Sequence, residues 1–194
     1  LDTTNNPELY IKRARCYTVR PNLIDNQYNL AVNDYNSAIS IRNDYYYYYY
    51  LRAFTKSKYL LKYESAIKDF KTSIELDSTY YYNYRDIAYA YRKLGKTELA
   101  LTTIDKAIDN LDNSYKKEAF LHNLKGKIYQ FDLSNYEDAL LSYQLSIMTD
   151  STYIRSYINR IGIYERSGDI DKAISDLNTL ISIDTNMYGV PGSF

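Results

Sequence analysis

The sequence has few of the residues that interrupt or cross-link a chain. Its 194 residues include 6 Gly, 3 Pro and a single cysteine, Cys16. A chain with so few turn-forming residues favours helices over many short strands. One cysteine excludes an internal disulfide. No run of about 18 apolar residues is present, so no membrane-spanning helix is predicted.

The sequence also lacks an excess of either charge and any recognisable catalytic motif. Lys and Arg together number 24, and so do Asp and Glu, which gives a net charge of zero. This balance argues against a protein whose main function is to bind the phosphate backbone of nucleic acids. His122 is the only histidine, and no Ser or Cys motif, Gly-rich phosphate loop or zinc-protease pair accompanies it. His122 and the distant Cys16 are too few for a metal site. We therefore expect no enzyme activity, no cofactor and no metal.

A short motif built around an alanine occurs five times. A large apolar residue follows each alanine by four positions, and a small or apolar residue comes three positions later, which places all three on one face of a helix. The anchoring alanines lie 35, 34, 39 and 34 residues apart: Ala31, Ala66, Ala100, Ala139 and Ala173. The sequence therefore predicts five related helical units.

A second helix is predicted upstream of each alanine. In the third unit an i, i+3, i+4, i+7 stripe predicts it, formed by Tyr84, Ile87, Ala88 and Tyr91. We expect Gly95 and Gly168 to end helices in the left-handed conformation. Asn6-Pro7-Glu8 predicts the start of the first helix. Ser134 and Glu137 are spaced as a capping box for the second helix of the fourth unit.

These units resemble the tetratricopeptide repeat, which has about 34 residues with aromatic, small and apolar residues in this order. The resemblance implies an all-α fold, a right-handed α-solenoid of about five helix-turn-helix repeats. We predict one array over residues 1–194, and expect it to be a segment of a longer repeat protein. Its repeats are predicted at 7–43, 44–78, 79–112, 114–151 and 152–185, with a tail at 186–194.

The resemblance also implies a concave groove lined by the first helix of each repeat. Aromatic and basic residues predominate at the corresponding positions, which suits a groove that grips an acidic or aromatic peptide. The predicted contact residues are Tyr48, Leu51, Thr55, Lys58, Tyr59, Tyr82, Arg85, Tyr89, Arg92, Asn123, Lys127, Arg155 and Arg166. We therefore predict a protein-interaction scaffold whose partner is a protein or peptide.

Tyrosine is unusually frequent, with 26 residues. Those at repeat positions, such as Tyr84 and Tyr143, are predicted to pack in the core. The run from Tyr45 to Tyr50 opens the first helix of the second repeat. It has two interpretations: a partly exposed aromatic helix start, or an adhesive platform for a ligand.

Two other functions stay open. The repeat length also fits a nucleic-acid-binding helical repeat protein, although the zero net charge disfavours it. The chain could also be a non-catalytic scaffold part of a larger assembly. The compartment is open too: we expect a soluble protein, either cytoplasmic or exported with its targeting segment removed. The sequence does not identify the partner or the oligomeric state.

Overall fold

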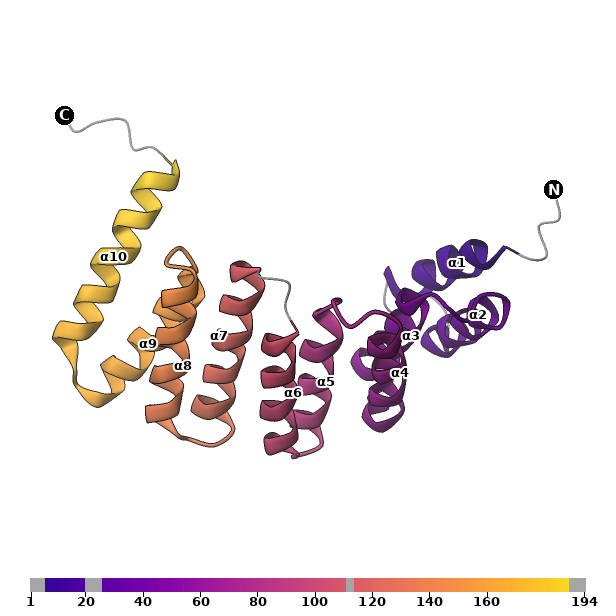
Figure 1. Cartoon of the computed structure of the whole chain (residues 1–194), viewed down its shortest axis with the longest axis horizontal. Helices are drawn as coiled ribbons and strands as arrows, with labels where there is room; N and C mark the ends of the chain where they lie inside the picture. Colours follow the sequence, from indigo (N-terminus) through magenta and orange to yellow (C-terminus); the bar gives the residue numbers. More distant parts are fainter. Residues whose placement is uncertain (1–5, 20–25, 111–113, 189–194) are drawn as a thin grey trace. The chain divides into compact units, whose positions relative to one another are not determined.

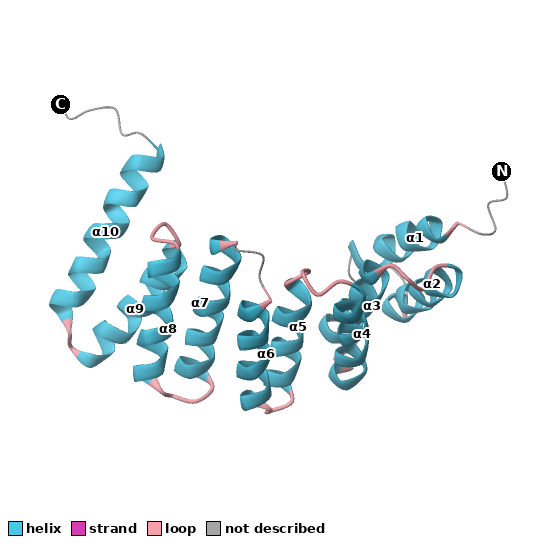
Figure 2. Cartoon of the chain, viewed as in Figure 1, coloured by secondary structure: helices cyan, strands magenta, loops and turns pink. Residues whose placement is uncertain are grey.

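A computed structural model describes residues 6–19, 26–110 and 114–188, with side chains given up to residue 183. Over this part of the chain there are ten α-helices and no strand (Figure 2). They are α1 (Pro7–Val19), α2 (Gln27–Ile41), α3 (Tyr46–Lys58), α4 (Tyr63–Leu76), α5 (Tyr82–Lys93), α6 (Thr97–Asp109), α7 (Tyr115–Phe131), α8 (Tyr136–Thr149), α9 (Ile154–Ser167) and α10 (Ile170–Tyr188). The fold is all-α, as predicted.

The helices form two compact units. The first, Leu1–Asn110, contains α1 to α6, and the second, Leu111–Phe194, contains α7 to α10 (Figure 1). Inside each unit consecutive helices pack as antiparallel pairs, α1 with α2, α3 with α4 and α5 with α6 in the first, α7 with α8 and α9 with α10 in the second. Each pair contains one of the five anchoring alanines in its second helix. The helical-repeat prediction is therefore confirmed.

Most of the predicted helix ends are found. The side chain of Asn6 accepts a hydrogen bond from the backbone N–H of Glu8 at 3.0 Å, at the start of α1. Gly95 and Gly168 have φ values of 70° and 80°, the left-handed conformation that glycine adopts without steric cost.

The capping box predicted at Ser134 is wrong. Ser134 has a φ of 53° and lies in the turn before α8. The N-cap is Asn135, whose side chain accepts a hydrogen bond from the N–H of Asp138 at 3.2 Å. Because Ser134 completes the preceding turn in a left-handed conformation, the capping position moves one residue along the chain.

The core follows the repeat motif. The five anchoring alanines are at most 3% exposed. In the first four pairs the bulky residue four positions after the alanine is at most 1% exposed: Tyr35, Phe70, Ile104 and Tyr143. The fifth, Leu177, is 42% exposed. A small alanine lets the paired helices approach, and the bulky side chain one turn later fills the space between them.

The tyrosine run packs onto neighbouring rings. None of Tyr45 to Tyr50 is fully exposed, and Tyr48 and Tyr50 are buried. Tyr80 is the shared neighbour: its ring centroid lies 4.9 Å from that of Tyr50 and 5.1 Å from that of Tyr46. Such edge-on and tilted contacts are favourable between aromatic rings. This geometry fits the partly exposed helix start better than the adhesive platform.

Buried tyrosines should make the protein sensitive to alkali. Burial raises the pKa of Tyr35 to about 12. Burial, together with the hydrogen bond to Glu8, raises the pKa of Tyr48 to about 12. Burial also raises the pKa of Tyr50 and Tyr143. In the folded chain these hydroxyls keep protons that the unfolded chain releases near pH 10.

We therefore expect the free energy of unfolding to fall as the pH rises above about 10. The stabilisation is fully present below that pH, and the part due to Tyr35 and Tyr48 is lost by about pH 12. Tyr35 alone should contribute a slope of up to about 1.4 kcal/mol per pH unit. Urea unfolding at a series of pH values should show a smaller slope for Tyr35→Phe. An unchanged slope in that variant would contradict the assignment.

Candidate functional site

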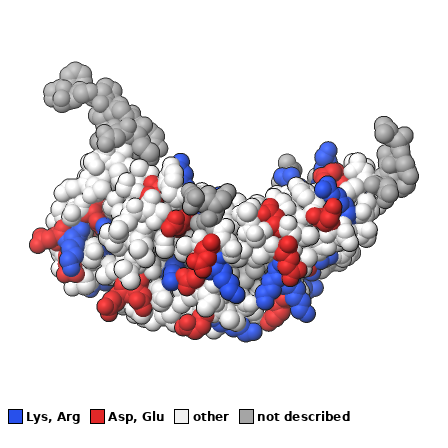
Figure 3. All heavy atoms as spheres, viewed as in Figure 1, with Lys and Arg blue, Asp and Glu red and all other residues white. Residues whose placement is uncertain are grey.

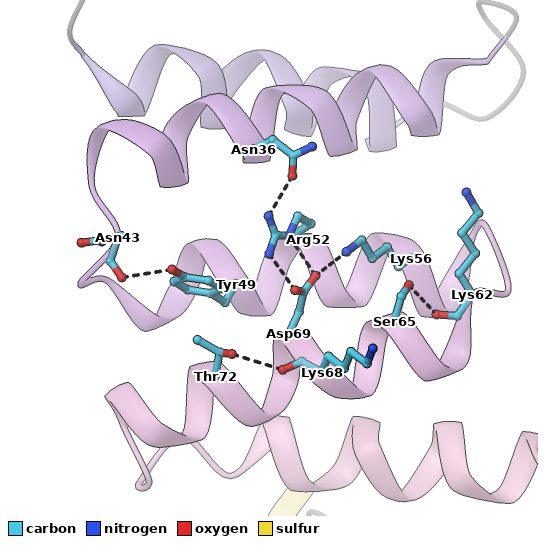
Figure 4. A network of polar contacts seen from close by, with 10 residues as sticks. All are labelled: Asn36, Asn43, Tyr49, Arg52, Lys56, Lys62, Ser65, Lys68, Asp69 and Thr72. Carbon is cyan, nitrogen blue, oxygen red and sulfur yellow. Dashed lines mark hydrogen bonds and ion pairs between the residues drawn. The ribbon is translucent and has the colours of Figure 1, made fainter.

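A partly buried ion pair ties three helices together in the first unit. The Arg52 guanidinium on α3 donates to both carboxylate oxygens of Asp69 on α4, at 2.8 and 2.6 Å (Figure 4). Its third nitrogen donates to Oδ1 of Asn36 on α2 at 2.8 Å, and Lys56 also bonds Asp69 at 2.7 Å. We call this arrangement the arginine clamp. It holds the α3–α4 pair against the preceding pair.

The arginine clamp recurs in the second unit. Arg160 on α9 donates to both oxygens of Asp176 on α10, at 2.8 and 2.6 Å, and to the side chain of Gln144 on α8. Burial alone would lower the pKa of Arg160, but the bonds to Asp176 raise it. Arg13 of α1 forms the same paired bonds with Asp34 of α2. Sequence analysis missed these pairs, although each aspartate follows its anchoring alanine by three residues.

Three of the predicted contact residues are buried. Tyr48 and Thr55 are 1% exposed and Asn123 is 4% exposed. Tyr48 donates its hydroxyl proton to Glu8 of α1, Thr55 bonds the carbonyl of Leu51, and Asn123 donates to Ser156 of α9 at 2.9 Å. They were predicted as surface contacts, but neighbouring helices cover them. Their side chains hold repeats together and are not available to a partner.

The remaining predicted residues of α3 and its C-cap residue, Tyr59, form an aromatic surface with one cation. Tyr59 stacks on Tyr28 with ring centroids 4.4 Å apart. Lys58 is exposed, and its ammonium lies 5.4 Å from the Tyr59 ring centroid and 5.1 Å from that of Phe54. Leu51 is half-buried in the core beside them. A cation held over ring faces is a cation–π arrangement.

Helix α5 presents a second set of rings and cations. Arg85 lies 4.7 Å from the Tyr82 ring centroid and bonds Asp86 at 2.7 and 2.9 Å. Tyr89 is 42% exposed, and the ammonium of exposed Lys93 lies 5.5 Å from its ring centroid. Half-exposed Arg92 lies next to Lys93 in the last turn. We define the α5 face as Tyr82, Arg85, Tyr89, Arg92 and Lys93.

The predicted residues of the second unit are less concentrated. Lys127 on α7 and Arg155 on α9 are exposed. Arg166, at the end of α9, lies 5.7 Å from the Tyr136 ring centroid. Arg166 and Tyr136 line a shallow cavity of about 300 Å³ together with Ile163. Arg166 is thus the predicted contact residue of this unit that lies over a ring, although Arg160 and Lys172 also lie within 6 Å of tyrosine ring centroids.

The described surface shows no feature of a metal site or a membrane span. Figure 3 shows Lys and Arg interspersed with Asp and Glu over the visible face. Among the residues with described positions, no three His, Cys, Asp or Glu side chains gather in a way that could hold a metal ion. No described helix is both long and apolar enough to cross a bilayer.

Comparison with known proteins identifies the repeats. The family model of the tetratricopeptide repeat matches residues 82–110 and 154–187, which are the α5–α6 and α9–α10 pairs. No curated protein sequence matches the chain.

Solved structures share the fold at low sequence identity. A fragment of MamA from Desulfovibrio magneticus RS-1 has a TM-score of 0.67 at 14% identity, over 94% of this chain and 97% of that one. YrrB, described as a TPR protein with an unusual peptide-binding site, has a TM-score of 0.58 at 17% identity, over 94% and 88%. PilF from Pseudomonas aeruginosa has a TM-score of 0.70 at 12% identity, over 91% and 75%. Residues 82–110 and 154–187 thus match the tetratricopeptide repeat itself, and the chain shares the helical-repeat fold of these solved structures.

Proposed function

We propose that this chain is a non-catalytic scaffold that binds a peptide segment of a partner protein on the first helices of its repeats. The α5 face carries the proposal, because it combines the exposed ring of Tyr89 and the half-buried ring of Tyr82 with three cations on one side of a helix. Rigid aromatic rings and arginine are the residues that most often anchor protein interfaces. The similar fold of YrrB, a TPR protein with a peptide-binding site, supports the same class of function.

The composition of these faces favours an acidic or aromatic segment. Lys58 and Lys93 lie over ring faces, where their charges stay accessible to a ligand carboxylate. Arg85 is already paired with Asp86, so we assign it a positioning role toward Tyr82. A peptide aromatic ring would stack against Tyr89 while its neighbouring carboxylate meets Lys93.

Charge reversal on the proposed surface should weaken peptide binding by about tenfold. The test is fluorescence anisotropy with a labelled peptide of alternating Asp and Phe residues, comparing the wild-type chain with a Lys58→Glu, Lys93→Glu variant. Both lysines are exposed, so circular dichroism should be unchanged. The matched control is Lys68→Glu, at an exposed position on α4, which should bind as the wild type does.

Two outcomes would contradict the proposal. Equal affinity of the double variant and the wild type would remove these faces from the binding site. Tighter binding of a polyuridine oligonucleotide, with a steep dependence on salt, would favour the nucleic-acid alternative instead.

A further inference from the structure

The arginine clamp that joins α3 to α4 and α2 has no counterpart one repeat later, at the positions that would join α5 to α6 and α4. Around α3 the clamp arginine bonds Asn36 and Asp69, which follow their anchoring alanines by five and three residues. One repeat later, the residues at these distances are Lys71 and Thr103. Counted back from the anchoring alanine, the position of Arg52 on α3 corresponds to Asp86 on α5, and the position of Arg160 on α9 corresponds to Ile87. Asp86 is engaged elsewhere, since its carboxylate accepts bonds from Arg85 and from the Tyr50 hydroxyl. None of these four side chains is an arginine, so the counterpart positions do not form the paired bonds of the clamp.

A cavity of about 360 Å³ lies at this position. Lys71, Ile87 and Thr103, three of the clamp counterparts, all line it. Its apolar wall comes from three helices and includes Ile74 and Leu99. This volume and this mixture of an apolar wall with a few polar groups are typical of a ligand-binding cavity.

The cavity is positively charged. Lys71 on α4 and Lys106 on α6 both line it and are exposed. None of its lining residues, all in the described part of the chain, is an Asp or Glu. Thr103 and Asn110 also line the cavity, but the Thr103 hydroxyl donates to the carbonyl of Leu99 at 2.6 Å and the Asn110 amide donates to that of Lys106 at 2.7 Å. A ligand carboxylate would find two cations here and no competing acid.

This cavity uses a different side of α5 from the α5 face. Tyr84, Ile87 and Tyr91 line the cavity, whereas Tyr82 and Tyr89 belong to the α5 face. Residues two apart on a helix point about 200° from each other, so the two sets lie on different sides. A ligand in the cavity would contact α4 and α6, the second helices of two consecutive pairs.

We propose that this cavity is a second docking site, for a protein segment that places an aliphatic side chain on its apolar wall and an adjacent Asp or Glu between Lys71 and Lys106. Two observations support this proposal. The cavity lies at the positions where the other repeats have an arginine clamp, and its two lysines favour an occupant with a negative charge. It is independent of the first-helix surface proposed above, because the two sites share no residue.

The probe is a labelled peptide with one Leu flanked by Asp residues, compared with the same peptide carrying Lys in place of Asp. Amide chemical shifts of the wild-type chain should change at Lys71, Thr103 and Lys106 with the acidic peptide only. The Lys71→Glu, Lys106→Glu variant should bind it about tenfold more weakly. Thr103→Trp, which fills the cavity without changing its charge, should also weaken binding.

The Lys58→Glu, Lys93→Glu variant is the matched control and should bind this peptide as the wild type does. Equal binding by all variants, or equal binding of the basic peptide, would overturn the proposal. So would shift changes at the cavity that appear without peptide as the protein concentration rises, since these would assign the cavity to a second copy of the chain. Loss of binding in the control variant alone would place the peptide on the first-helix surface and also overturn the proposal.

Discussion

Replacing Gly126 by alanine should destabilise the second unit by about 1–3 kcal/mol, as is usual when a methyl group is forced into a packed core. A Cβ at this position would lie 2.5 Å from Cε1 of Tyr143 on the facing helix α8. The Tyr143 side chain cannot easily move away. It is fully buried, and its hydroxyl donates to Oε1 of Gln130 at 2.6 Å. Urea unfolding followed by circular dichroism measures the effect.

Gly162 on α9 is the matched control. A Cβ there meets no atom within 4 Å, and the residue lies inside a helix. Gly162→Ala should therefore stabilise the chain by about 0.5–1 kcal/mol, the usual gain from removing a glycine from a helix interior. Opposite signs for the two substitutions are the expected result. Similar stability of both variants would show that the α7–α8 contact is looser than the structure indicates.

Breaking the arginine clamp of the second unit should have the largest effect. The Arg160→Met substitution keeps the length of the side chain but leaves the Asp176 carboxylate, 8% exposed, without its partner. Removing one member of a buried pair typically costs about 3–5 kcal/mol, because the remaining charge is buried and uncompensated. The bond to Gln144 is lost as well, so α8, α9 and α10 should separate more easily.

Lys172→Met is the matched control, since it also removes one positive charge from this helix pair. Lys172 and Asp169 form an exposed pair at 3.3 Å, with side chains 64% and 46% exposed. Exposed pairs contribute about 0–1 kcal/mol. Denaturant unfolding should therefore separate the two variants by at least about 2 kcal/mol. A difference below that would mean that water reaches Asp176 once the arginine is gone.

The candidate binding surface was only partly predictable from the sequence. Repeat positions identified the rings and cations of α5, because spacing along one helix decides which residues share a face. The same reasoning assigned Tyr48, Thr55 and Asn123 to the surface. They are buried because side chains of adjacent helices bond to them or cover them. Burial depends on the neighbouring repeat, which the spacing within one helix does not describe.

The sequence by itself determined the all-α fold, the five helix pairs and the alanines and bulky residues between them. These features depend on local periodicity, which is visible along the chain. Only the tertiary structure showed that the arginine clamp forms, and that a cavity lies beside α5 where the clamp is absent. Each needs side chains from three helices, and the distances between those side chains exist only once the helices have packed.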